Sequence, residues 1–201
     1  MKSIPSRDKN KLSALSSFSQ FGSSRVVIDC TYIDIATPGL MIEQNTTYSN
    51  YRGIHSFKDI VGVAPNGVIT YVSKLYPGSI SDRAIVQQSG FLNYLTAGDM
   101  VLEDKGFLIQ DLVPNGVTVN IPPFLNNGTF TENEARAIKA IAKCRIHIKR
   151  ANAGLKDFKI LSFIPSYLRC HADIIFQLCG SLVNLQFPLI KEGCEGYEFT
   201  N

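Results

Sequence analysis

The sequence has no pair of cysteines at the close spacing that is typical of protein zinc ligands. Its five cysteines, an odd number, are scattered between Cys30 and Cys194. An odd count without a regular framework gives no support for a disulfide scaffold and favours reduced thiols in an intracellular protein. Because there are only three histidines as well, we do not expect a zinc site.

Long apolar runs are also missing. Residues 174–185 are apolar, but this stretch is too short to span a membrane and is interrupted by Gln177 and Asn184. The first 22 residues are polar and rich in serine and lysine, so they do not resemble a secretory signal, and we expect a flexible tail over residues 1–22. With 201 residues, 45% of them hydrophobic, the chain is long enough for one domain with a sizeable core.

Positive charge is concentrated in one segment. The formal net charge is only +3, which does not by itself indicate a nucleic-acid partner. Eight Lys or Arg residues, however, lie between Arg136 and Lys159, within a predicted helix that runs from Thr131 to about Lys159. Thr131 and Glu134 have the spacing of a capping box, which marks the start of this helix.

At about 100° per residue, the side chains of this helix sort onto different faces. The apolar face that should meet a core contains Ile138, Ile141, Ile148 and Leu155. A basic face contains Arg136, Lys139, Lys143 and Arg150, with His147 beside them. This face is either solvated or a contact for the phosphate backbone of DNA, and the sequence leaves both readings open.

A polar line runs among the apolar residues of the same helix. Its members are Arg145, Lys149, Asn152 and Lys156. Charged residues are rarely placed toward a core without a partner, so the line predicts a buried polar site.

The order of predicted elements indicates a mixed α/β fold. A buried strand is expected over residues 25–35, a loop over 37–56, a hairpin over 57–64 and 68–75, a short helix from Ser81 and Asp82 to about residue 89, strands over 100–102 and 117–121, the long helix, and an apolar helix over 167–185. This order predicts a mixed sheet of about five strands flanked by helices.

Two aspartates lie where a ligand site is expected. Asp29 lies in the middle of a strand that is apolar on both sides, where an unpaired carboxylate is costly, so a cation or a donor network should face it. Asp104 follows the strand over residues 100–102, a common position for ligand and metal chemistry. Two such acids on neighbouring strands can hold a divalent cation. The alternatives are a hydrogen-bonded structural role for Asp29, a turn role for Asp104, and for Asp82 a helix N-cap instead of a supporting role at the site.

Several stretches, in order along the chain, resemble the DDE superfamily endonuclease domain of transposase-derived proteins, related to the PIF/Harbinger group. They are Asp29-Cys-Thr, Thr47-Tyr-Ser-Asn-Tyr51, Val61-Gly-Val-Ala-Pro-Asn-Gly67, Tyr76-Pro-Gly-Ser-Ile-Ser-Asp82, Leu102-Glu-Asp-Lys-Gly-Phe107, Asn120-Ile-Pro-Pro-Phe124, Arg145-Ile-His-Ile-Lys-Arg-Ala151 with Leu155-Lys156, and Asn184-Leu-Gln-Phe-Pro188. The resemblance implies an RNase H-like domain over residues 23–190, followed by a tail over 191–201. It implies that Asp29 and Asp104 are catalytic acids that hold Mg²⁺ or Mn²⁺ for attack on a phosphodiester.

The third acid is where this chain departs from the family pattern. That pattern on the long helix resembles Arg-x3-Glu-x6-Lys, and here Arg145 and Lys156 match while Lys149 occupies the position of the glutamate. A lysine for a glutamate changes the charge by two, at a site where cation binding depends on negative ligands.

Two hypotheses follow from this departure. The first is a metal-dependent DNA endonuclease or strand transferase that Lys149 impairs. The second is a catalytically inactive, domesticated or degenerate copy that acts as a DNA-binding or protein-binding module. For both hypotheses we expect an intracellular protein, nuclear or alternatively cytoplasmic, with DNA as a partner and a separate DNA-binding protein that supplies targeting. No membrane association is expected.

Overall fold

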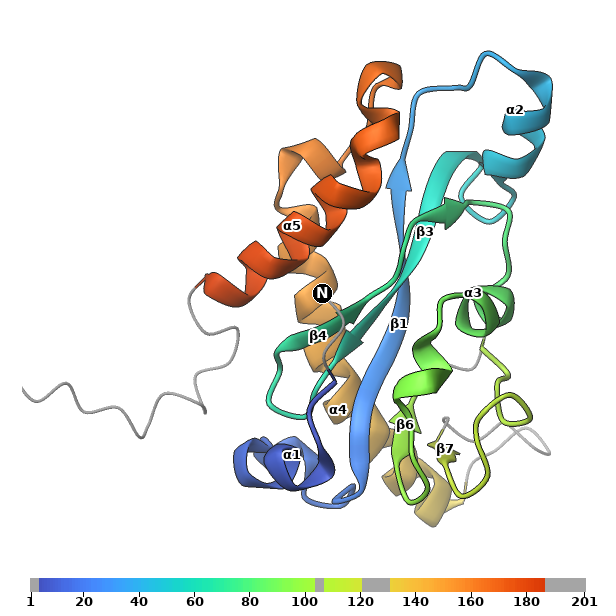
Figure 1. The fold of residues 1–201 in the computed structure, drawn as a ribbon. Helices are drawn as coiled ribbons and strands as arrows, with labels where there is room; N and C mark the ends of the chain where they lie inside the picture. The colour runs from blue at the N-terminus through green and yellow to red at the C-terminus, as the bar shows by residue number, and fades with distance from the viewer. Residues whose placement is uncertain (1–3, 104–106, 121–130, 187–201) are drawn as a thin grey trace, which may run out of the picture.

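The computed structural model describes residues 4–103, 107–120 and 131–186, and shows a central sheet with helices on both faces (Figure 1). The strands are β1 (Ser24–Asp34), β2 (Tyr48–Ser49), β3 (Ile54–Val63), β4 (Ile69–Val72), β5 (Tyr76–Pro77), β6 (Met100–Leu102) and β7 (Thr118–Asn120). The α-helices are α1 (Arg7–Ser13), α2 (Met41–Thr47), α3 (Asp82–Gln88), α4 (Glu132–Lys156) and α5 (Ala172–Leu185). Short 3-10 helices are η1 (Ser16–Phe18), η2 (Phe91–Tyr94), η3 (Lys159–Leu161) and η4 (Ser166–His171).

The sheet is mixed, as predicted. Among the described residues its main path has five strands in the order β2-β3-β1-β6-β7, and the short strands β4 and β5 also pair with β3. The predicted hairpin is confirmed as β3 and β4, and Gly67 closes its turn at a φ of 85°, which favours glycine. The expectation of a mixed α/β sheet of about five strands flanked by helices is confirmed.

Strand β1 is the axis of the sheet. It pairs antiparallel with β3 over residues 27–34, but parallel with β6 only over residues 24–27. Because β6 ends at Leu102, no strand of the described chain pairs with the β6 side of β1 over residues 28–34. This open edge positions the candidate site.

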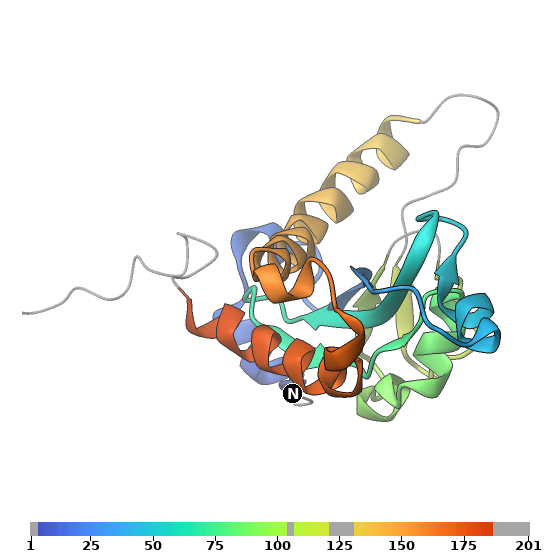
Figure 2. The same ribbon diagram turned by 90° about the horizontal axis from the view of Figure 1, so that it is seen from above.

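Helix α4 lies across the sheet and begins at the predicted capping box. The Thr131 hydroxyl accepts a hydrogen bond from the Glu134 N–H, and the Glu134 carboxylate accepts one from the Thr131 N–H at 2.8 Å. Ile141, Ile148 and Leu155 are buried, which confirms most of the predicted apolar face. Figure 2 shows that the N-terminal part of α4 extends beyond the sheet.

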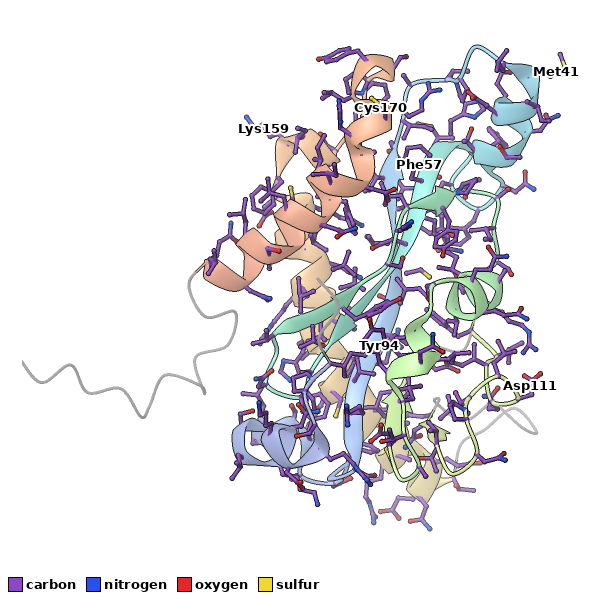
Figure 3. The ribbon with its side chains drawn as sticks, viewed as in Figure 1. Met41, Phe57, Tyr94, Asp111, Lys159 and Cys170 are labelled. Carbon is purple, nitrogen blue, oxygen red and sulfur yellow. The ribbon has the colours of Figure 1, made fainter. Side chains whose placement is uncertain are left out.

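Each face of the sheet has its own apolar cluster. Val61 of β3, Ile148 of α4 and Phe176 of α5 belong to one cluster, and Phe57 packs against it. The other cluster lies toward α3 and η2, and Tyr94 packs at its margin. Figure 3 labels Phe57 and Tyr94, which mark the two faces.

The expectation of a flexible tail over residues 1–22 is wrong for the part of that segment that packs against the core. Leu15 and Phe18 are buried in the core, and Arg7 of α1 forms an ion pair with the buried Asp99 at 3.3 Å. The same segment covers His147, whose Nε2 lies 2.7 Å from the Ser17 hydroxyl. His147 is therefore buried and does not belong to an exposed basic face.

A second difference concerns residues 37–56, which were expected to form a loop. The structure places α2 and β2 within this segment. Helix α2 has seven residues, no side-chain cap and one buried residue, Thr47, so it lacks the features by which a helix is recognised in a sequence. No helix in the described part of the chain is both long enough and apolar enough to cross a membrane.

Candidate active site

A cavity of about 300 Å³ opens beside the unpaired edge of β1, where helix α4 passes. The strand contributes Asp29, Cys30, Thr31 and Tyr32, and the helix contributes Lys149, Asn152, Ala153 and Lys156. The strand and the polar line of the helix were predicted separately, and the structure brings them together at this cavity.

The carboxylate of Asp29 faces a donor network. Its Oδ1 accepts a hydrogen bond from the backbone N–H of Cys30 at 3.0 Å, and its Oδ2 accepts one from Nδ2 of Asn152 at 3.2 Å. Asp29 is partly exposed, because the edge of β1 lacks a strand partner at this point. Its position in the middle of a strand is therefore compatible with both a structural role and a ligand role.

Three residues of α4 reach the cavity from one side of the helix. Lys149, Asn152 and Lys156 are separated by three and four residues, so they share a face. Asn152 is buried, whereas both lysines are exposed. Long lysine side chains keep their ammonium groups in water, so Asn152 is the most buried of these three residues.

One atom of Asn152 has no partner among the described residues. Its Oδ1 is buried, and no described hydrogen-bond donor reaches it. A buried acceptor without a donor costs about 1–3 kcal/mol. The amide atom that contacts the Asp29 carboxylate is Nδ2, so this oxygen lies on the other side of the amide group.

The described residues fit a divalent cation in part. Asp29 and Asn152 Oδ1 offer two oxygen donors in one cavity, while Lys149 and Lys156 add two positive charges that lower cation affinity. No group of three or more His, Cys, Asp or Glu residues that could hold a metal occurs in the described parts of the chain. These two oxygen atoms are therefore what the described residues could offer to a metal.

Asp104, the second predicted acid, lies outside the described residues. It follows Leu102 and Glu103, and β6 is the parallel neighbour of β1. Strand β6 therefore ends at Leu102 on the same side of β1. The structural role of Asp104 stays a prediction.

Asp82 is not among the described residues that line the cavity. The alternative reading of Asp82 as a helix N-cap is wrong, and its supporting role stays a prediction. The N-cap of α3 is Ser81, whose hydroxyl accepts from the Ala84 N–H at 3.2 Å. Asp82 instead forms an ion pair with the buried Lys58. It also acts on Cys30: burial raises the pKa of that thiol, and the charge of Asp82 and a hydrogen bond to it raise the pKa further. Cys30 therefore stays a neutral thiol.

The remaining basic residues lie apart from the cavity or at its margin. Arg145, half-buried, precedes Lys149 by one turn of α4. Arg136, Lys139, Lys143 and Arg150 are all exposed. At 100° per residue, their face lies roughly 140° around the helix from the cavity face. Arg136 also forms an exposed ion pair with Glu132 at 2.8 Å, which offsets its charge locally.

Two residues of interest were not assigned a role from the sequence. Asn152 was placed in the polar line, but its contact with Asp29 joins residues 123 positions apart, which the sequence alone does not reveal. Asp59 of β3 is fully buried near Asp29, and its strand was predicted without any role for this carboxyl. The signal for both was a polar residue within an apolar pattern.

The mixed sheet, with an aspartate in the middle of its central strand and a long helix across one face, has the RNase H-like architecture. The family model described as DDE superfamily endonuclease matches residues 28–184. The match spans most of the chain, and the chain belongs to this family.

Curated relatives from mammals are similar to part of the chain. The human protein named "Putative nuclease HARBI1" is 28% identical over 88 residues, which is 42% of this chain and 24% of that protein. The relatives of the same name from Bos taurus and Rattus norvegicus are 27% and 28% identical over 88 and 87 residues. The match thus spans about a quarter of the length of these relatives. No solved structure matches the chain.

Proposed function

We propose that this chain is a DDE-type nuclease domain that binds a DNA phosphodiester at the Asp29 cavity, and that Lys149 impairs its metal-dependent cleavage or strand transfer. The observation that carries the proposal is that Asp29 and Lys149 line one cavity. Family membership supports the nuclease class, and the lysine supports the impairment.

The roles of the residues follow from their chemistry. Asp29 and Asp104 are the acids that would hold Mg²⁺ or Mn²⁺, with Lys149 at the family's third position. A divalent cation in such a site stabilises charge on the phosphoryl oxygens and activates the attacking water or hydroxyl. Lys156 and Arg145 would contact the phosphates, because ammonium and guanidinium groups are phosphate donors.

The impairment is an electrostatic effect of moderate size. A charge pair about 4 Å apart interacts by about 1 kcal/mol in water and about 4 kcal/mol at an effective dielectric constant of 20. Lys149 is exposed, so its ammonium group can move away from the cation and the penalty falls toward the lower figure. Weak metal binding is therefore expected, with metal needed at high concentration.

A second candidate is a catalytically inactive copy that binds DNA or a protein without cleavage. The observation that favours it is the charge of the cavity, where two lysines outnumber the single described carboxylate. For either candidate, DNA as a partner implies nuclear localisation and a separate DNA-binding protein that supplies targeting. Contact of the basic face with phosphates is part of both candidates.

A cleavage assay distinguishes the two candidates. Supercoiled DNA is incubated with wild type, Lys149→Glu and the double variant Lys149→Glu/Asp29→Asn over a series of Mg²⁺ and Mn²⁺ concentrations. The nuclease proposal predicts weak cleavage by wild type, stronger cleavage by Lys149→Glu and none by the double variant. Absence of cleavage by Lys149→Glu at every metal concentration rejects the nuclease and leaves the binding module.

A further inference from the structure

We propose that the rings of Tyr32 and Tyr51 form a stacking platform for an unpaired base, next to the cavity that takes the phosphodiester. The ligand at this site is then DNA that is single-stranded over at least one nucleotide, such as a tail or a frayed end, and not a continuous duplex. This inference rests on the proposed function, because it describes the DNA that the same cavity binds. It does not depend on a metal or on cleavage.

The first observation is an exposed aromatic ring on a turn that is held in place. Tyr51 is 87% exposed, and it lies in the turn that joins β2 to β3. The carbonyl oxygen of the buried Ser49 accepts hydrogen bonds from the backbone N–H groups of Arg52 at 3.2 Å and Gly53 at 2.7 Å. Gly53 has a φ of 70°, which favours glycine. The ring is thus presented to solvent from a preorganised backbone, which lowers the entropy cost of binding.

The second observation is that this ring continues the wall of the cavity. Tyr32 of β1 lines the cavity, and its ring stacks on that of Tyr51, with centroids 6.2 Å apart and an angle of 27° between the planes. Aromatic pairs at this separation are offset, so each ring keeps part of its face uncovered. Because Tyr51 is so exposed, most of its ring is accessible to a further planar group. A base that stacks there extends a pair of rings that begins at the cavity wall.

The third observation concerns the cations that surround Tyr32. The Nζ atom of Lys58 lies 4.9 Å from the centroid of the ring, and the Cζ atom of Arg52 lies 6.0 Å from it. Lys58 forms an ion pair with Asp82. Nη2 of Arg52 donates to both carboxylate oxygens of Asp34 at 3.1 Å. These two cations are therefore neutralised, and their contacts with the ring fix its position in the wall of the cavity.

The positive charge that is left for a phosphate lies at the cavity itself. Among the described lining residues, Lys149 and Lys156 outnumber the single carboxylate of Asp29, and both lysines are exposed. A phosphate suits such a lining better than a cation does, because ammonium groups donate charge-assisted hydrogen bonds to phosphate oxygens. The site thus offers a place for the phosphate of a nucleotide and, beside it, an aromatic face for the base.

Stacking on a side chain requires an unpaired base. Within a duplex the faces of each base are covered by its neighbours, and only the edges are accessible in the grooves. Proteins that bind single strands combine a positively charged groove with aromatic rings on which successive bases stack. Two tyrosines beside two lysines have this composition on a small scale.

The experiment measures DNA affinity by fluorescence anisotropy, without divalent metal and at one fixed salt concentration. The ligands are a blunt duplex, the same duplex with a short single-stranded tail, and the same duplex with an abasic tail, which keeps the phosphates but lacks the bases. The proteins are wild type, Tyr51→Ala, Tyr51→Phe and, as the matched control, Tyr167→Ala, which removes a tyrosine that is 78% exposed in η4. Thermal unfolding verifies that each variant is folded.

We expect the tail with bases to raise the affinity of wild type at least about fivefold over the blunt duplex, the effect of one stacked base. Tyr51→Ala should lose this gain. Tyr51→Phe and Tyr167→Ala should keep it, because stacking needs a ring at position 51 and not a hydroxyl. On the abasic tail, wild type and Tyr51→Ala should bind equally, since no base is present to stack.

The outcomes distinguish the inference from the function on which it rests. If wild type binds the blunt and the tailed duplex equally, or if Tyr51→Ala keeps the gain, the inference is overturned and DNA binding stands. Loss of the gain in Tyr167→Ala as well, or an equal weakening of the blunt duplex by Tyr51→Ala, overturns it too, because the effect is then not specific to an unpaired base on Tyr51. If wild type binds none of the three ligands, both the inference and the proposed function are rejected.

Discussion

At the scale of single residues, the least expected feature is the carboxyl of Asp59. It is fully buried in β3, and neither of its oxygens has a hydrogen-bond donor among the described residues. Burial raises its pKa well above the ordinary value of 3.8, and the charges of Asp173 and Asp29 raise it further. The folded protein therefore binds a proton here more tightly than the unfolded chain does.

This pKa shift has a defined consequence for stability. Because the folded-state pKa of Asp59 exceeds the unfolded value, its contribution is most favourable below pH 3.8 and is lost progressively as the pH rises from 3.8 toward the folded pKa. At neutral pH, the carboxyl lowers the free energy of unfolding.

Asp59→Asn should therefore stabilise the protein at pH 7, because an amide needs no proton to stay neutral. We expect a gain of about 1 kcal/mol or more, which is about 2–4 °C in the melting temperature. Thermal unfolding measured from pH 4 to pH 8 should also show a smaller loss of stability with pH than in wild type. Asp8→Asn, at an exposed carboxyl, is the control. Equal melting temperatures for Asp59→Asn and wild type at pH 7 would contradict the account.

At the scale of elements, α4 shows what local sequence signals predict well. Its N-terminus was predicted from Thr131 and Glu134, and its apolar face from residues spaced by three to seven positions. Both signals lie within the sequence of the helix itself, so they do not depend on contacts with the rest of the fold. Helix α2 and the packed N-terminal segment were missed, because α2 has no side-chain cap and the N-terminal segment gains its order from contacts with distant residues such as Asp99.

The capping box itself can be tested. Thr131→Ala removes the hydroxyl that accepts from the Glu134 N–H, and the unsatisfied donor should cost about 1 kcal/mol. Urea unfolding gives the free-energy difference. Asn133→Ala, at an exposed position of the same turn, should change it by less than about 0.5 kcal/mol. Equal effects of the two substitutions would show that the cap does not stabilise the helix.

At the scale of the whole molecule, the sequence predicted the mixed sheet and the family. It did not predict the contact between strand β1 and helix α4 at the cavity. The resemblance implied that Asp29 and Lys149 belong to one site, and the two residues line one cavity, while their catalytic roles stay predictions. It gave no role to Asn152, since the pattern has no acid there and the contact with Asp29 is made only by the folded chain. The part of the site that departs from the pattern is thus the part that required the structure.

The basic face of α4 should contribute to DNA binding separately from the cavity. Lys139 and Lys143 are exposed, and they lie on the other side of the helix from the cavity. Lys139→Gln and Lys143→Gln should each reduce the slope of log affinity against log salt by about 1, because each phosphate contact releases about one counterion. Fluorescence anisotropy with duplex DNA, measured without divalent metal, gives this slope.

The matched control is Lys9→Gln, an exposed lysine of α1. Its salt slope should equal that of wild type. If all three variants have the wild-type slope, the basic face is a solvated surface and the DNA contacts lie elsewhere.

The central claim is that the charge at position 149 limits cation binding at the Asp29 cavity, and calorimetric titration with Mn²⁺ tests it most directly. Lys143→Glu is the matched control, because it makes the same charge change on the basic face of the same helix. We predict that Lys149→Glu binds Mn²⁺ roughly tenfold or more tightly than wild type, a gain of about 1.4 kcal/mol, and that Lys143→Glu does not. Tight binding of two Mn²⁺ ions by wild type, unchanged in Lys149→Glu, would contradict the account.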